Sequence, residues 1–269
     1  MTSQSAHQVS TYQFGDSDLA AERLRRLAAV FEPSSRAFLQ SLSIAAPRAI
    51  ADLGCGPGYT SRMLAEVFPT ARVLGIDSSP QFVAIAERSP AERVCYAVAD
   101  VAQSLPSGPF DVIYCRYLLT HLTEPLAAIA RWSERLRPGG LLCIEENDSI
   151  RTTQPAFAQY LAIVEAMLAD AGQKLYVGLD LDRNATGKRL RKQSSRVVPV
   201  GVTERAAAEM FLPNLATWRD RPFARQRYAV EELDRLRDDL QRLVDENSTV
   251  RSISFGLRRL VLQRTEQHD

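Results

Sequence analysis

Three alternating glycines, Gly54, Gly56 and Gly58, mark the part of the sequence best suited to hold a ligand. An apolar run at residues 50–53 precedes them, and a helical pattern of apolar residues follows directly. This order predicts a strand, a tight loop and a helix. Glycine lets the backbone adopt positive φ and approach a bound molecule, and the start of the helix offers unpaired N–H groups at its positive end. The pattern therefore predicts a site for a nucleotide-like ligand.

The spacing of the glycines distinguishes between such ligands. A dinucleotide-binding loop has the pattern Gly-x-Gly-x-x-Gly, in which the third glycine lets the helix pack closely on the strand. Here Tyr59 occupies that third place, and Asp52 lies two residues before the first glycine. The resulting Asp-x-Gly-x-Gly-x-Gly resembles the first motif of the class I S-adenosylmethionine-dependent methyltransferases. A glycine-rich turn without a ligand is the alternative interpretation.

Two acids follow at the ends of later apolar runs. Asp77 ends the run at residues 72–76, and Asp100 ends the run at residues 94–99. In a doubly wound sheet, an acid about twenty residues after the glycine loop can accept hydrogen bonds from both ribose hydroxyls, so Asp77 is the expected ribose ligand. Its alternative is a plain surface acid. The resemblance implies that Asp100 accepts the adenine amino group and that the Val101 N–H donates to a ring nitrogen.

Two more segments extend the resemblance. Residues 110–116 resemble the fourth strand of this family, and residues 136–145, with a Pro-Gly-Gly turn, resemble the turn into its fifth strand. Together the matches cover about residues 50–147. They imply S-adenosyl-L-methionine as the cofactor and S-adenosyl-L-homocysteine as its product. The implied cofactor-binding residues are Asp52, Gly54, Cys55, Gly56, Gly58, Asp77, Ser78, Asp100, Val101 and Arg116.

The elements that must position these residues alternate between strands and helices. This alternation predicts a parallel sheet that is covered on both faces. The resemblance implies a doubly wound, mostly parallel α/β sheet of seven strands. We expect two helices before the sheet, because Pro33 interrupts the helical pattern that starts at Asp18. The expected strands are at about 49–53, 72–76, 94–99, 110–115, 140–145, 196–202 and 250–262, and the expected later helices at about 59–68, 80–88, 124–136, 155–171, 203–211 and 229–246.

We divide the chain into two parts. Residues 1–45 are expected to form a flexible segment and helices that act as a lid, and residues 46–269 the methyltransferase domain. After the fifth strand the regular alternation stops. Residues 150–195 are therefore expected to form a substrate-side insert that walls the acceptor site, with a dimer contact as the alternative.

Candidate residues for the acceptor follow the fourth and fifth strands, where the switch-point crevice should open. His121 could act as a general base near neutral pH or contact the substrate, although the leucines around it favour a structural role. Glu146 and Asp148 could bind a cationic acceptor or cap the following helix. A base is needed only where the acceptor keeps its proton. The substrate-binding candidates are Tyr12, Tyr117, His121, Glu146, Asp148 and Tyr176.

The composition argues against several classes of protein. A formal net charge of +1 provides no field for nucleic acid or an anionic membrane. No apolar run approaches the ~20 residues that span a bilayer. The four cysteines show neither a disulfide framework nor metal-ligand spacing. We therefore expect a cytoplasmic protein without a metal and without nucleic-acid or membrane partners.

These observations predict an enzyme that transfers a methyl group from S-adenosylmethionine to oxygen, nitrogen or carbon of a small molecule by in-line displacement. One alternative is methylation of RNA or protein, which would need a basic groove or a recognition domain. The other is a protein that binds S-adenosylmethionine without transferring methyl. The sequence specifies neither the acceptor nor the oligomeric state, for which a dimer stays open.

Overall fold

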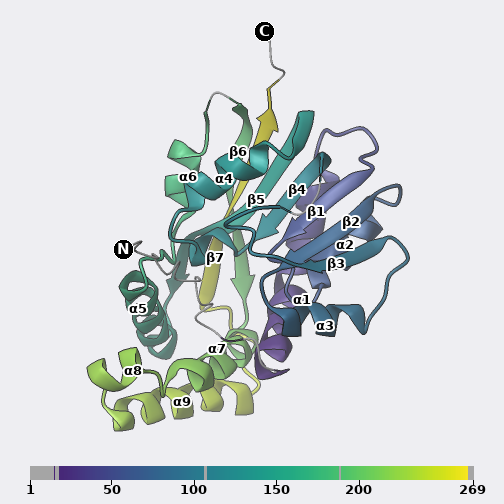
Figure 1. Cartoon of the computed structure of the whole chain (residues 1–269). Helices are drawn as coiled ribbons and strands as arrows, with labels where there is room; N and C mark the ends of the chain where they lie inside the picture. The colour runs from purple at the N-terminus through teal and green to yellow at the C-terminus, as the bar shows by residue number, and fades with distance from the viewer. Residues whose placement is uncertain (1–14, 16–17, 106–107, 188, 266–269) are drawn as a thin grey trace, which may run out of the picture.

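A seven-stranded sheet with helices packed on both faces organises the chain (Figure 1). The computed structural model describes residues 15, 18–105, 108–187 and 189–265. The strand order is β3-β2-β1-β4-β5-β7-β6. β7 runs antiparallel to both of its neighbours, and the pairs among β1 to β5 are parallel. This confirms the predicted fold class of a doubly wound, mostly parallel seven-stranded α/β sheet. The strands are β1 (Ala49–Leu53), β2 (Arg72–Asp77), β3 (Val94–Val98), β4 (Phe110–Arg116), β5 (Leu136–Thr152), β6 (Leu190–Val202) and β7 (Ile253–Arg264).

Helices connect and cover these strands. A 3-10 helix, η1, spans Leu119–His121 after β4. The α-helices are α1 (Asp18–Gln40), α2 (Tyr59–Val67), α3 (Pro80–Glu87), α4 (Pro125–Ser133), α5 (Pro155–Asp170), α6 (Gly178–Asn184), α7 (Glu204–Trp218), α8 (Pro222–Arg227) and α9 (Val230–Asp245).

Alternating side chains of the central strands enter two separate cores. In β4, Ile113 packs in the core beneath α4 and α6, whereas Val112 and Tyr114 pack in the core beneath α1 and α2. Both groups are completely buried, because a parallel sheet covered by helices exposes neither face. The sheet therefore gives a rigid base whose strand ends can position a site.

A third core lies at one end of the sheet, where α5, α7, α8 and α9 gather (Figure 1). The rings of Tyr160 and Phe211 stack there at 4.1 Å, and the ring of Phe157 meets Phe211 edge-on at 5.4 Å. Aromatic contacts of this kind stabilise beyond the area they bury. Helices α5 and α7, far apart in the sequence, are thereby held as one wall.

The structure corrects three expectations about elements. A single helix, α1, runs through Pro33 in place of two, and Phe31 and Phe38 on either side of the proline are buried in cores. β5 continues to Thr152, well beyond the expected residue 145, because it pairs with β7 along its length. Residues 172–195, expected to be irregular, contain α6 and the start of β6. Tertiary pairing decides each of these outcomes.

The proposed boundary at residue 45 falls after α1, but α1 packs closely against elements that follow the boundary. Helix α1 packs against α2 and α7, and its Leu39 is completely buried against the sheet. Within the described part of the chain, every helix falls short of what a bilayer span requires in length or apolar character.

Candidate functional site

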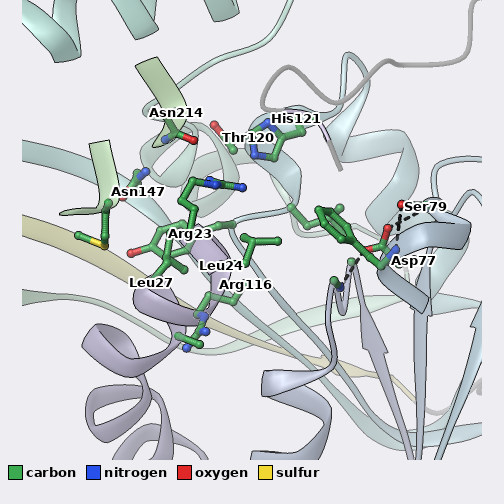
Figure 2. Close-up of a pocket in the computed structure, with 18 of the residues that line it drawn as sticks. Arg23, Leu24, Leu27, Asp77, Ser79, Arg116, Thr120, His121, Asn147 and Asn214 are labelled. Atoms are coloured by element: carbon green, nitrogen blue, oxygen red, sulfur yellow. Dashed lines mark hydrogen bonds between the residues drawn. The ribbon is translucent and has the colours of Figure 1, made fainter. Parts of the chain in front are cut away.

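A pocket of about 590 Å3 opens where the loops after β1, β2 and β4 meet helices α1, α5 and α7 (Figure 2). We name its two sides by their walls. The loop half comprises Gly54, Cys55, Gly56, Asp77, Ser78, Ser79, Asp100, Val101 and Arg116. The chamber comprises Leu27, Phe31, Tyr117, Asn147, Ile150, Tyr160, Leu161, Val164, Leu168, Leu175, Met210, Phe211, Asn214 and Phe255.

The glycine loop uses its glycines for two different purposes. Gly54 and Gly56 line the pocket with φ of 66° and 50°, a left-handed backbone that favours glycine. Gly58 does not line the pocket. A Cβ atom on Gly58 would lie 2.3 Å from the hydroxyl oxygen of Tyr96, so this glycine makes room for the tyrosine ring.

Asp52 lies beneath the loop and not on the pocket. Its carboxylate is 1% exposed and accepts hydrogen bonds from the hydroxyls of Thr60 and Ser61, each at 2.6 Å. Burial raises the pKa of Asp52 to about 6, and the two hydroxyls act in the opposite direction. Its place argues against the predicted direct contact with a cofactor. Asp52 instead ties the first turn of α2 to the end of β1.

Asp77 joins the loop to the next helix at the pocket wall. Its Oδ2 accepts from the N–H of Gly56 at 2.8 Å, and its Oδ1 accepts from the N–H of Ser79 at 2.9 Å. Ser79 in turn caps α3 by accepting from the N–H of Phe82 at 3.1 Å. The carboxylate is therefore oriented by the backbone on both sides, and Figure 2 shows it at the pocket wall.

Asp100, Val101 and Arg116 also lie where the sequence predicted them, on the loop half. Asp100 accepts from the N–H of Ala102 at 2.9 Å, which fixes the turn after β3. The Val101 carbonyl accepts from the indole N–H of Trp132 at 2.7 Å. Arg116 donates to the Ser35 hydroxyl at 3.0 Å, so α1 contacts the end of β4.

A sharp turn after β4 brings Tyr117 into the chamber. Tyr117 has φ of 55°, an uncommon conformation for a large side chain. Strain of this kind persists where the surroundings enforce it and is frequent at functional sites. The Tyr117 hydroxyl is buried, and no described residue is within hydrogen-bond reach of it.

Glu146 holds this turn in place. Its Oε1 accepts from the N–H groups of Leu118 and Leu119 at 2.7 and 2.6 Å. The side chain is completely buried and is absent from the pocket lining, and burial raises its pKa to about 8. Glu146 thus caps η1, which precedes it in the chain, so its contacts support neither binding of a cationic substrate nor the expected cap on the following helix.

His121 does line the pocket, beside Arg23 of α1 (Figure 2). Burial, and to a smaller extent the positive charge of Arg23, lowers the pKa of His121 to about 3. A group with so low a pKa is neutral near pH 7 and is a weak proton acceptor. The structure therefore favours a structural or contact role for His121 over that of a general base.

Two other substrate candidates, Asp148 and Tyr176, are absent from the described lining of the pocket. Asp148 is held in an ion pair with Arg258 at 2.6 Å. Tyr176 is half-buried and packs against the helical core behind the chamber. Tyr12 lies outside the described residues. Within the expected wall at residues 150–195, the residues that line the pocket are Ile150, four residues of α5 and Leu175. Helix α6, in the same region, packs against β5 and β7.

Most of the chamber escaped sequence reasoning. The helix expected at residues 155–171 fell within the predicted acceptor wall and the helices before residue 45 within the predicted lid, but no lining residue of either was named, and α7 gave no separate signal. Asn147 and Asn214 each bury a side-chain oxygen for which no described residue is a partner. Asn214 also donates to the Tyr160 hydroxyl at 2.9 Å, which fixes its orientation.

The described acidic groups of the pocket all lie on its loop half. Among the described residues that line it, the acidic ones are Asp77 and Asp100, both on the loop half. The cationic ones are Arg23, Arg116 and Arg221. No group of three or more potential metal ligands occurs in the part of the chain that was searched.

Comparison with known proteins agrees with this architecture. Residues 51–144 match a family model described as a methyltransferase domain. The chain is 33% identical over 138 residues to a trans-aconitate 2-methyltransferase of Methylobacterium nodulans, which covers 48% of this chain and 53% of that protein. The chain thus spans about half the length of the curated relatives it matches.

Two solved structures show how widely the fold is shared. One is Haemonchus contortus phosphoethanolamine N-methyltransferase 2 in complex with phosphomonomethylethanolamine and S-adenosylhomocysteine, with a TM-score of 0.55, 18% identity, and coverage of 90% of this chain and 57% of that chain. The other is the [4+2]-cyclase SpnF, with a TM-score of 0.51, 20% identity, and coverage of 96% and 86%. At these identities the likeness shows the fold alone.

Proposed function

Because the chain belongs to the class I S-adenosylmethionine-dependent methyltransferase family, we propose that it transfers the methyl group of S-adenosylmethionine to a small molecule. One observation carries this proposal. The pocket joins an acid-and-glycine loop half, suited to a nucleoside, directly to an apolar chamber that can hold a second molecule.

The loop half fits the cofactor. Asp77 lines the pocket with a carboxylate, a group that can accept hydrogen bonds from ribose hydroxyls, and its bonds from the N–H groups of Gly56 and Ser79 orient it. Asp100 and the N–H of Val101 would hold the adenine, and the cation of Arg116 would face the cofactor carboxylate. Gly54 and Gly56 keep side chains away from the loop surface there.

The chain's own contribution to the reaction is orientation and exclusion of water. The cofactor supplies a methyl group that is already activated on a sulfonium. Alignment of two bound molecules can supply about 7–11 kcal/mol of the barrier to a displacement. The apolar wall of α5 and α7 would keep water from the reacting groups.

A small acceptor suits this chamber better than a polymer. Helices α1, α5 and α7 and the extension of β5 and β7 surround it, and its lining is mostly apolar. A nucleic-acid groove would need available basic side chains, and two basic residues at the start of the β6 region, Arg189 and Lys192, are engaged in ion pairs with Glu134 and Asp182. The curated relative is named for a small organic acid.

Calorimetry with S-adenosylhomocysteine tests the cofactor site. Asp77→Ala should weaken binding by about 2–3 kcal/mol, or about 30- to 140-fold, because charge-assisted hydrogen bonds to ribose are lost. Glu87→Ala, at the exposed end of α3, is the control and should leave the affinity unchanged. Equal affinity in wild type and Asp77→Ala would remove Asp77 from the site.

Incubation of the protein and a cell extract with methyl-labelled S-adenosylmethionine tests transfer. Label in the small-molecule fraction supports the proposal. Label in RNA or protein would favour a macromolecular acceptor. Binding of S-adenosylhomocysteine with no label in any fraction would favour a protein that binds the cofactor without transferring methyl.

A further inference from the structure

We propose that the methyl acceptor is a molecule with an apolar body and a single carboxylate, and that the carboxylate oxygen receives the methyl group. This inference rests on the proposed function and names its substrate class. Four features of the chamber and its surroundings support it: the apolar walls, the sign of the nearby charges, the lack of a base and the nature of the polar groups.

The walls of the chamber select an apolar body. Leu161, Val164 and Leu168 face it from α5, and Met210 and Phe211 face it from α7. These side chains are nearly all buried within the helical core. Apolar surface on a ligand gains about 25 cal/mol per Å2 when such walls remove it from water.

The charges near the chamber favour an anion and disfavour an amine. Arg23 and Arg221 line the pocket beside the chamber, and no acidic residue lines that side among the described residues. Arg23 is 4% exposed, and its charge already acts on the pocket interior, because it lowers the pKa of His121. An ammonium group placed there would meet like charge in a poorly solvated site.

No described group on the pocket is suited to remove a proton near pH 7. His121 has a pKa of about 3, and burial raises the pKa of Tyr117 well above the ordinary value for tyrosine. Glu146, with a pKa of about 8, is engaged in capping η1 and does not line the pocket. The described residues therefore favour an acceptor that is already a nucleophile at neutral pH and need not first lose a proton to the protein.

A carboxylate meets this condition, because its ordinary pKa of about 4 leaves it ionised at neutral pH. An oxygen lone pair forms the new O–CH3 bond while the S–CH3 bond breaks, and its electron pair stays on sulfur. The products are a neutral methyl ester and the thioether S-adenosylhomocysteine. The charges of carboxylate and sulfonium cancel, and no proton is transferred.

The polar groups in the chamber argue for one carboxylate and against several. Apart from Arg23 and Arg221 beside it, the chamber offers only uncharged polar side chains among the described residues, those of Tyr117, Asn147, Tyr160 and Asn214. Several buried carboxylates would each need a charged or strongly donating partner. The proposal differs here from the trans-aconitate 2-methyltransferase to which the chain is similar, and that similarity covers 48% of this chain and 53% of that protein.

Binding of matched compounds to the full chain saturated with S-adenosylhomocysteine tests the proposal. The probes are 3-phenylpropanoate, 3-phenylpropan-1-ol and 3-phenylpropan-1-amine, which share one apolar body, and trans-aconitate as the tricarboxylate. We expect calorimetry to give a Kd for the phenyl acid at least about tenfold below that of the other three. An amine, an alcohol or trans-aconitate that binds as tightly as the acid would overturn it.

The Asn214→Asp variant tests the same inference by adding a negative charge to an uncharged polar position of the chamber with little change of shape. The variant should bind 3-phenylpropanoate at least about tenfold more weakly and 3-phenylpropan-1-amine more tightly than the wild type does. Its Kd for S-adenosylhomocysteine should stay within about twofold. Asn184→Asp, on exposed α6, is the matched control and should change none of these values. An unchanged order of preference in Asn214→Asp would contradict the proposal.

The product formed from a cell extract gives an independent result. A methyl ester releases labelled methanol under mild alkali, so small-molecule label that mild alkali leaves in place would contradict the proposal. The cofactor experiment separates the two levels of inference. Binding of S-adenosylhomocysteine without binding of any phenyl compound refutes the acceptor class alone, whereas failure to bind S-adenosylhomocysteine refutes the proposed function.

Discussion

The two sides of the pocket are built in opposite ways. The loop half takes its groups from the ends of four successive strands, within residues 54–116, and the backbone orients its carboxylates. The chamber takes its side chains from residue 27 to residue 255 and is mostly apolar. A site made from consecutive strand ends can be preserved while a site made from distant helices is remodelled. One fold can therefore keep a common cofactor and change its acceptor.

A buried ion pair joins the two sides. Arg259 of β7 donates to Glu145 of β5 at 2.9 Å, and Tyr114 of β4 donates to the other oxygen of the same carboxylate at 2.7 Å. Arg259 also donates to the Ser34 hydroxyl of α1 at 2.6 Å. The helix that covers the chamber is thus fastened to the strands that carry the loop half.

Removing the Arg259–Glu145 ion pair should have the largest effect on stability. Arg259→Leu leaves the completely buried Glu145 carboxylate without its cation, so we expect the free energy of unfolding to fall by about 3–5 kcal/mol. Because α1 loses its attachment, acceptor binding should suffer more than S-adenosylhomocysteine binding. Urea unfolding and calorimetry measure the two effects.

The control removes an arginine of the same sheet edge that is exposed. Arg189 lies 3.2 Å from Glu134, and both side chains are about half exposed or more, at 49% and 60%. Arg189→Leu should therefore change stability by less than about 1 kcal/mol. A similarly small loss in Arg259→Leu would show that the two sides of the pocket are not coupled through this pair.

The glycine loop should respond to a single added methyl group. Gly58 and Gly139 have nearly equal φ, of 80° and 78°, but a Cβ on Gly139 would meet nothing within 4 Å. Gly139→Ala should cost only the backbone strain, about 1 kcal/mol. Gly58→Ala should cost about 2–3 kcal/mol, because it also displaces the Tyr96 ring, and it should weaken S-adenosylhomocysteine binding. Equal melting temperatures for the two variants would contradict the packing role of Gly58.

The same contrast explains which parts of the molecule the sequence could predict. Glycine spacing and acids at strand ends are local features, so the place of Asp77, Asp100, Val101 and Arg116 on the pocket followed from their positions along the chain. Local spacing could not tell a glycine that faces the ligand from Gly58, which faces Tyr96, since that depends on the next strands of the sheet.

The chamber depends on packing between distant helices. The apolar stripe of α5 has the same periodicity whether it faces a solid core or a cavity, and the position of α7 decides which. The same holds for Glu146, whose role as a buried cap follows from the turn that folds over it. Helix α1 continues through Pro33 because other elements pack against the helix on both sides of the proline. The local pattern around a proline gives no information about such packing.

Glu146 supplies a pH-dependent test of the turn between the two sides. Its pKa rises from an ordinary 4.5 to about 8 in the folded chain, so its contribution to stability is complete at low pH and disappears as the pH rises to about 8. Between pH 7 and 8 the wild type should lose about 1 kcal/mol from this group. Glu146→Gln keeps an acceptor for the two N–H groups and should remove that loss. Urea unfolding at both pH values measures this loss. If the wild type and Glu146→Gln lost the same free energy of unfolding between pH 7 and 8, Glu146 would not be a buried acid with a raised pKa.

The smallest effect should come from a hydroxyl inside the chamber, measured against one outside it. Tyr117 and Tyr114 lie three residues apart at the end of β4, but the Tyr114 hydroxyl donates to buried Glu145 at 2.7 Å, whereas no described residue is a partner for that of Tyr117. Tyr114→Phe should lower the free energy of unfolding by about 1–3 kcal/mol, because it removes a donor from a buried carboxylate.

Tyr117→Phe should leave the free energy of unfolding unchanged or raise it by up to about 1 kcal/mol, since a buried polar group without a partner among the described residues is removed. It should also change the Michaelis constant for the acceptor and leave S-adenosylhomocysteine affinity intact. If the two variants lost the same free energy of unfolding, the Tyr117 hydroxyl would have a structural role and would not be available to bind an acceptor.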